Sequence, residues 1–409
     1  MTHNELLEKY ADLAVKVGVN IQPNQWLYIG ATIDNAPFVR LVTKKAYEAG
    51  AKQVFVDWSD DEVSRMRYDL APEDSFGEFP DWKRVEREQM AKEGAAFMNI
   101  VSASPDLLKG VNPEKISAFQ RAAGKALSQY RKYIQSDKVS WTVIAAPSVG
   151  WAKKVFPENS DEDAVEALWN AIFKAVRVDQ ENPVEAWITH DKTLHEKADY
   201  LNTKRYSKLH YTAPGTDLVI DLPEGHLWAG AGSVNEKGHT FMANMPTEEV
   251  FTVPHKDGVN GTVTNTKPLS YGGNIIDGFT LTFENGRIVD IKADEGQEIL
   301  TKLIETDEGS HRLGEVALVP HQSPISQSNV LFYNTLFDEN ASNHLAIGSA
   351  YAFCIEGGKN MNEEELANSG LNSSITHVDF MIGSDQMDID GITKDGQREP
   401  IFRNGDWAF

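Results

Sequence analysis

Residues 25–58, QWLYIGATIDNAPFVRLVTKKAYEAGAKQVFVDW, decide the fold of the first half of the chain. The short apolar runs 25–31 and 52–58 are typical of buried strands, and the stretch 36–49 between them has helical character. A strand, a helix and a second strand in this order form a right-handed crossover between parallel strands. We therefore predict an N-terminal α/β domain with a mainly parallel sheet.

The flanking segments extend this pattern in both directions. Residues 4–18 predict a helix that Asn4 caps. Further along, residues 95–102 and 140–147 are apolar runs that predict two more buried strands, with one long helix over 112–134 between them. The predicted N-terminal sheet therefore has four strands.

Phosphate-binding signals are absent from this predicted α/β domain. No G-x-G-x-x-G follows the first strand, and no G-x-x-x-x-G-K-[ST] occurs in the chain, so nucleotide binding is not expected. The acidic residues Asp57, Asp60 and Asp61 lie at the end of the second strand or just after it. We interpret them as a solvated loop, with the lining of a crevice as the alternative.

Beyond residue 207 the sequence pattern changes to short runs with strand character, separated by turn residues. The pair Asn285-Gly286 lies between alternating strands and predicts a hairpin. Helices are expected at 295–306, 342–353 and 363–368. We predict an α+β, mainly antiparallel C-terminal domain.

Together these patterns predict two domains in a chain of 409 residues. The α/β domain is expected at 1–182 and a helical linker at 183–206. The metal-binding catalytic domain is expected at 207–409.

The charge of the chain is concentrated in its second half. Of the net −22, residues 207–409 carry −18, with 12 basic against 30 acidic side chains. Such a surface repels nucleic acid phosphates, so we expect no nucleic acid partner. The single cysteine, Cys354, excludes intrachain disulfides and fits a reducing cytoplasm. No apolar run reaches the roughly 18 residues of a membrane span, so no membrane partner is expected either.

Groups able to bind divalent metals recur between Glu315 and Asp379. His344 and Tyr351 are seven residues apart, which on the predicted helix differ by about 20° in direction. His377 and the carboxylate of Asp379 are two residues apart and share one face of a predicted strand. These spacings aim several donors at one point.

An acidic pair, Glu248 and Glu249, adds to this set from an extended segment upstream. With Glu249 counted beside Glu315 and Asp379, three carboxylates, two imidazoles and a phenol are too many ligands for one tetrahedral zinc. They suit two divalent ions that share a carboxylate and a water. Zinc, cobalt and manganese all accept such oxygen and nitrogen donors.

Four segments, in order along the chain, resemble the thermophilic aminopeptidase family, which includes aminopeptidases T, S and PepS. They are MPTEEVFT, HRLGEVALV, FDENASNHLAIGSAY and THVDFMIGS. The resemblance implies a metal-dependent aminopeptidase that acts as a homodimer on peptides with a free N-terminus. It also implies six metal ligands, namely Glu249, Glu315, His344, Tyr351, His377 and Asp379.

The resemblance and the donor set together predict a mechanism. One ion holds the substrate α-amine, the other polarises the scissile carbonyl, and a water between them attacks. A carboxylate must carry the proton to the leaving amine. We favour Glu339 over Glu248, because Glu248 adjoins the ligand Glu249 and neighbouring strand residues face opposite ways. Glu315 is the expected bridge between the two ions.

Two other functions are compatible with these donors. A dinuclear metal phosphoesterase uses similar ligands, but it needs basic groups beside the metals, and the four segments offer only Arg312. A non-enzymatic metal-dependent binding protein is the second alternative. Structural metal sites are normally closed by four ligands and favour cysteine, whereas this set leaves room for water.

The aromatic C-terminus, residues 406–409, bears on the expected homodimer. Trp407 and Phe409 are costly to leave in water. They either join two subunits or pack back onto their own domain, and the sequence leaves both possibilities open.

Overall fold

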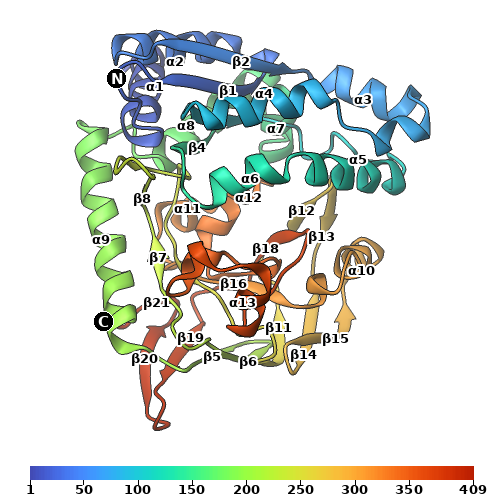
Figure 1. Ribbon diagram of the computed structural model, residues 1–409, viewed down its shortest axis with the longest axis vertical. Helices are drawn as coiled ribbons and strands as arrows, with labels where there is room; N and C mark the ends of the chain where they lie inside the picture. Colours follow the sequence, from blue (N-terminus) through green and yellow to red (C-terminus); the bar gives the residue numbers. More distant parts are fainter. The chain divides into compact units, whose positions relative to one another are not determined.

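The computed structural model describes residues 1–409. The chain divides into two units, one made of 1–191 with 232–246, the other of 192–231 with 247–409. The division falls within helix α9 (Pro183–Lys204, green in Figure 1), and a short later segment returns to the first unit. The domain boundaries proposed from the sequence stay a prediction. No helix has the length and apolarity needed to cross a membrane.

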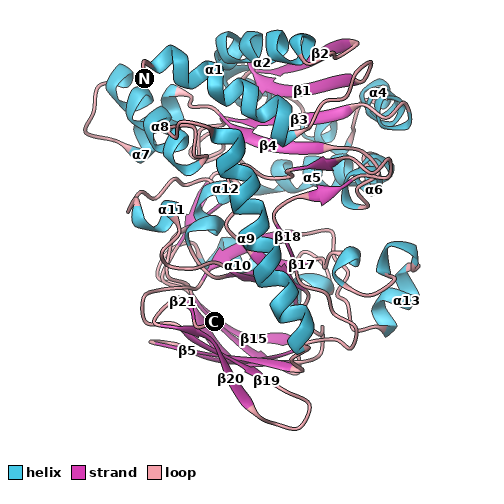
Figure 2. Cartoon of the chain, turned by 90° about the vertical axis from the view of Figure 1, so that its left-hand side faces the viewer, coloured by secondary structure: helices cyan, strands magenta, loops and turns pink.

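The first unit contains a parallel sheet in the strand order β2-β1-β3-β4. Figure 2 shows the four strands in this order from top to bottom. Their bounds are Trp26–Thr32 (β1), Gln53–Ser59 (β2), Ala96–Val101 (β3) and Trp141–Ala145 (β4). The predicted α/β fold class is therefore confirmed, and all four predicted strands are present.

The first helix begins earlier than predicted. Thr2, not Asn4, is the N-cap, because its hydroxyl accepts from the Glu5 N–H while the Glu5 carboxylate accepts from the Thr2 N–H. The helix predicted over 112–134 is in fact two helices. The helices of this unit are α1 (His3–Leu13), α2 (Ala36–Glu48), α3 (Asp61–Leu70), α4 (Asp81–Lys92), α5 (Pro113–Ala126), α6 (Ser128–Gln135), α7 (Val149–Val155) and α8 (Asp161–Ala175).

The second unit contains an eight-stranded antiparallel sheet in the order β15-β14-β11-β6-β5-β19-β20-β21. The predicted Asn-Gly hairpin joins two of these strands, with φ of 49° at Asn285 and 80° at Gly286. The strands are β5 (Lys208–Ala213), β6 (Thr216–Asp221), β11 (Val259–Thr264), β14 (Thr280–Glu284), β15 (Arg287–Lys292), β19 (Asp388–Ile392), β20 (Arg398–Arg403) and β21 (Asp406–Trp407).

A second, five-stranded antiparallel sheet has the order β18-β17-β16-β10-β7. Its strands are β7 (Ala229–Gly230), β10 (Val250–Thr252), β16 (Leu313–Leu318), β17 (His344–Gly348) and β18 (His377–Met381). Apolar side chains from one face, among them Val316, Leu345 and Phe380, join a core cluster with residues of the eight-stranded sheet. The opposite face is left for the polar groups described below. The predicted mainly antiparallel C-terminal fold is confirmed.

Helices and short strands complete the second unit. The helices α10 (Gln297–Ile304) and α13 (Glu363–Asn368) agree with the predictions for those segments. The aromatic tail packs onto its own unit, since the Phe409 ring stacks on Tyr200 at 3.7 Å and the Trp407 ring lies 4.5 Å from Phe402. Further short elements are α11 (Pro324–Gln327), α12 (Thr335–Asp338), and the paired short strands β12 (Leu269–Tyr271) and β13 (Asn274–Ile276).

Candidate metal centre

Strand register places four of the predicted ligands on one face of the five-stranded sheet. Glu315 pairs with Ala346, which pairs with Asp379, so all three side chains share a face. His344 lies two residues before Ala346 on β17, and His377 lies two residues before Asp379 on β18. The face therefore collects two imidazoles and two carboxylates from three neighbouring strands.

Glu249 reaches the same face from the next strand. It precedes β10, in which Phe251 pairs with Ala317, and Ala317 in turn pairs with His344. Because Glu249 lies two residues before Phe251, an extended chain turns both side chains the same way. Glu249 is 7% exposed and His344 1% exposed, so this part of the site is closed to bulk water.

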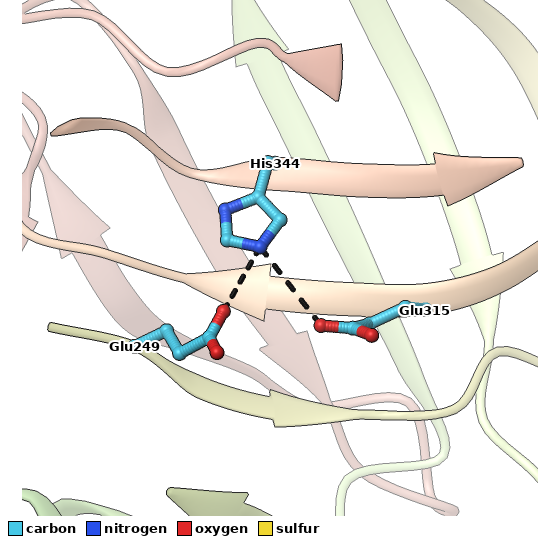
Figure 3. Close-up of side chains that lie close together, drawn as sticks. All are labelled: Glu249, Glu315 and His344. Atoms are coloured by element: carbon cyan, nitrogen blue, oxygen red, sulfur yellow. Dashed lines mark ion pairs between the residues drawn. The ribbon is translucent and has the colours of Figure 1, made fainter. Parts of the chain in front are cut away.

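The five donors form two groups that share one residue. In the first, His344 Nε2 lies 3.0 Å from Glu249 Oε2 and 3.9 Å from Glu315 Oε1 (Figure 3). In the second, His377 Nε2 lies 3.2 Å from Glu315 Oε2 and 3.5 Å from Asp379 Oδ1. Within each group the donor atoms lie within 4.8 Å of one another. One oxygen of Glu315 thus faces each histidine.

Backbone carbonyls orient both imidazoles. The Nδ1 atom of His344 lies 3.1 Å from the Ser342 carbonyl, and that of His377 lies 2.8 Å from the Ser349 carbonyl. A hydrogen bond from Nδ1–H to a carbonyl fixes the tautomer and leaves the Nε2 lone pair for a metal ion. Both histidines therefore turn Nε2 toward the carboxylates of the site.

The helix predicted over 342–353 is wrong. His344 lies in strand β17, and Tyr351 follows it just before a short 3₁₀ turn, Ala352–Cys354. The physical reason is that side chains alternate between two faces along this segment. Leu345 and Ile347 face the core, while His344, Ala346 and Gly348 lie on the face of the site. Tyr351 still reaches the site, with its ring centroid 4.9 Å from that of His377.

A β-bulge aims Glu315 at the site. The register between β16 and β17 shifts between Leu313 and Glu315, which leaves Gly314 as the extra residue. A Cβ at Gly314 would lie 2.3 Å from the Ser349 carbonyl oxygen and 2.4 Å from that of Gly348. Only glycine allows this close approach of the two strands.

Small residues make the room between the donors. Ala346 lies between Glu315 and Asp379 in the cross-strand row, and Ala317 lies beside His344. Both alanines are completely buried. Their methyl groups leave the space above the sheet to the longer side chains, which therefore meet over it.

The two candidate proton carriers are buried residues that lie outside the five strands of the sheet. Glu339 is 9% exposed and Glu248 is 4% exposed. Asn340 connects the two, since its Oδ1 accepts the Glu248 N–H at 2.7 Å and its Nδ2 lies 3.4 Å from Glu339 Oε1. The sequence did not single out Asn340, although its place in the motif with Glu339 and His344 was the available signal.

Burial and mutual charge shift the protonation of this cluster. Burial raises the pKa of Glu339 well above its usual value, and the Asp379 and Glu249 carboxylates raise it further. Burial also raises the pKa of Glu315, to about 7, against the opposing effect of His377. Buried carboxylates crowded together in this way hold protons when no cation is present.

The pKa values of the two histidines are raised as well, although burial acts on them in the opposite direction. Burial alone would lower the pKa of His344, but its hydrogen bond and charge interaction with Glu249 outweigh this and raise the pKa to about 10. The pKa of His377 is also raised well above its usual value by Tyr351, Asp379 and Glu315, against the effect of burial. The site therefore attracts positive charge, whether protons or metal ions.

The chain belongs to the thermophilic metalloprotease family (M29), whose model matches residues 3–407. This agrees with a buried centre of carboxylates and histidines. The chain is 68% identical over 406 residues to the aminopeptidase AmpS of Bacillus subtilis strain 168, covering 99% of each chain. It is 43% identical over 402 residues to aminopeptidase T of Thermus thermophilus, covering 98% of each.

A solved structure supports the same assignment. The wild-type AmpT structure from Thermus thermophilus matches with a TM-score of 0.94 at 42% identity, covering 100% of both chains. The family resemblance inferred from the four motif segments is therefore confirmed. The individual ligand roles of the six residues stay predictions.

Proposed function

We propose that this chain is a metal-dependent aminopeptidase that binds two divalent ions bridged by Glu315. The observation that carries the proposal is that Glu315 belongs to both donor groups. One of its carboxylate oxygens faces His344 and the other faces His377. A carboxylate that serves two donor groups at once is the arrangement that dinuclear hydrolases use.

The donor set fits two such ions. Glu249 and His344 would complete the first group, and His377 and Asp379 the second. Tyr351 would add its phenol beside His377. Oxygen and nitrogen donors accept zinc, cobalt or manganese. When bound, the ions would anchor the substrate α-amine, polarise its carbonyl and acidify a water for attack.

Residues of the chain itself would manage the proton. Glu339 is the favoured carrier, because burial and three neighbouring carboxylates raise its pKa and so suit it to accept a proton and pass it on. Glu248 is the alternative, and its position depends on the same Asn340 side chain. Replacement of Glu339 by Gln should reduce turnover strongly while both metals stay bound.

Substrate chemistry supports cleavage at a free N-terminus. A free α-amine can coordinate a metal ion through its nitrogen lone pair, whereas acetylation delocalises that lone pair into an amide. We expect Leu-peptides to be cleaved and their N-acetyl derivatives to be resistant. Equal cleavage of both would remove the amine from the recognition step.

The basic group needed by the phosphoesterase alternative is committed elsewhere. Arg312 donates to the Lys256 carbonyl and to Asp257 Oδ1, both at 2.8 Å.

The deciding experiment removes metal by chelation and restores zinc, cobalt or manganese in steps. Release of a chromophore from a leucine anilide should return as the second equivalent binds, whereas release from a phosphate ester should not.

Two further properties belong to this proposal. We expect a homodimer, on the family resemblance, and sedimentation at nanomolar concentration is its test; a monomer under those conditions would contradict it. A cytoplasmic location fits the single, fully buried thiol of Cys354. Fractionation of cells would check it.

A further inference from the structure

A polar row crosses the parallel sheet of the first unit, where an apolar row is normal. Asp57 of β2, Gly30 of β1 and Asn99 of β3 are direct cross-strand neighbours, so they share one face. Strands of parallel sheets are usually covered on both faces by helices. Here Asn99 is exposed although β3 is an interior strand, and Asp57 and Gly30 are partly exposed.

The same face is fully covered only two residues earlier. Tyr28 of β1 and Phe97 of β3 are 4–5% exposed and pack with Met90 of α4. The covering layer therefore ends before the carboxyl ends of the strands. What remains is a cavity of about 880 Å³ with the polar row as its floor.

This cavity lies where an α/β sheet binds ligands. The chain passes from β1 to β2 on one side and then continues to β3 on the other side of β1. Ligands of open α/β sheets bind at the carboxyl ends of the strands at such a reversal. Gly30 and Asn99 belong to the two strands that flank it. A Cβ at Gly30 would press within 3.1 Å of Asn99 Oδ1, so glycine keeps the floor open.

The walls combine positive charge with apolar surface. Asp57 receives two cations, Lys83 at 3.1 Å and Arg87 at 3.2 Å, so one positive charge is left over at the floor. Arg67, whose guanidinium lies 4.5 Å from the ring centroid of Phe119, adds a further cation. Two carboxylates, Glu78 and Asp81, also belong to the lining, but both are exposed and Asp81 is paired with Arg84. The aromatic rings of Trp58, Phe79 and Phe119 supply the apolar part of the lining.

We propose that this cavity binds a small organic carboxylate that carries an apolar or aromatic group. The carboxylate would accept from Lys83 and Arg87, Asn99 would hydrogen-bond its polar substituent, and the ring would lie among the aromatic walls. Free amino acids and the C-termini of short peptides share this chemistry. The site belongs wholly to the first unit and does not depend on the metal centre.

A phosphate is a poorer match than a carboxylate. The turn after β1, residues 33–35, contains no glycine to bring backbone N–H groups around a phosphate. The Asp57 carboxylate already shares the two cations of the floor, and it would repel a dianion more than a monoanion.

The test measures binding of three probes to the metal-loaded, full-length protein by titration calorimetry. N-acetyl-L-phenylalanine has the carboxylate and the ring but no amine, and L-phenylalanine has all three. N-acetyl-L-phenylalaninamide lacks both the carboxylate and the free amine, so it differs from the first probe only in the carboxylate. Lys83→Met removes a wall cation. Lys92→Met is the matched control, because Lys92 is exposed on the same helix and lies outside the cavity lining.

We expect N-acetyl-L-phenylalanine to bind once per chain and about tenfold more weakly to the Lys83→Met protein, the loss typical of one charge-assisted hydrogen bond. Lys92→Met should bind like the unaltered protein. Asn99→Leu gives an independent check on the floor and should weaken binding as well. Stronger binding of L-phenylalanine than of its acetyl derivative, weakened by Lys83→Met to the same degree, would identify free amino acids, and equal binding would admit peptide C-termini. Absence of binding, equal binding of the amide, or equal affinity in both lysine variants would overturn the proposal.

Discussion

Replacing Gly314 by alanine should disable the metal centre without unfolding the chain. The added Cβ would meet the Ser349 carbonyl oxygen at 2.3 Å, whereas ordinary contact begins near 3.4 Å. Strands β16 and β17 must therefore separate locally by about 1 Å. This separation would displace two groups of the site. Glu315 adjoins Gly314 in the chain, and the Ser349 carbonyl orients His377.

The expected size of the effect follows from the tolerance of metal coordination. Ligand distances in metal sites hold within about 0.2 Å, so a shift of about 1 Å exceeds the tolerance several-fold. Losing an orienting contact typically weakens metal affinity by about 10–100-fold. The overpacked strands should cost about 1–3 kcal/mol of unfolding free energy, which leaves a domain of ordinary stability folded.

The assay combines metal content after dialysis against limiting zinc with thermal unfolding of the metal-free protein. Gly77→Ala is the matched control, because a Cβ there meets no atom within 4 Å. If Gly314→Ala kept two metals per chain at unaltered affinity, the bulge would not be what positions Glu315, and the argument from the close strand approach would fail.

Three further predictions concern the donors. His344→Ala and His377→Ala should each leave less than two metals per chain by elemental analysis and abolish hydrolysis, and two retained metals in either variant would contradict the ligand assignment. Tyr351→Phe should be milder, with both metals kept and turnover reduced, because the ring still packs against His377. In the metal-free protein the pKa of His344 is raised to about 10, so its interaction with Glu249 stabilises the fold fully below pH 6.5 and is lost as the pH rises toward 10. Zinc binding at pH 7 should therefore release protons. Calorimetry in buffers of different ionisation enthalpy would detect this release.

The parts of the fold that depend on local sequence were predictable. The βαβ segment 25–58 and the Asn285-Gly286 hairpin each carry their signal within a few residues, and both are present. The first helix shows the limit of this method. Its true cap, Thr2, acts through a reciprocal bond with Glu5, and Asn4 is the same kind of residue only two positions away.

The chemistry of the centre was also visible in the sequence, but its construction was not. Residue types and motif order indicated carboxylates and imidazoles in one place. The carbonyls of Ser342 and Ser349, which orient the histidines, carry no sequence signal, because every residue has a carbonyl. Gly314 is similar, since its role appears only when β16 and β17 lie side by side.

The error over 342–353 shows why strand geometry is needed at this site. On a helix His344 and Tyr351 would point the same way, but positions 344, 346 and 348 would point in different directions. On β17 these three positions share a face at intervals of about 6.6 Å. Pairing then brings Asp379 to Ala346 and His377 to Gly348, so that donors from three strands, together with Glu249, fall into two groups that share Glu315. A seven-residue spacing suggested one shared direction along a helix, whereas the alternation of small and apolar residues in HLAIG gives one sheet face over which the two donor groups lie.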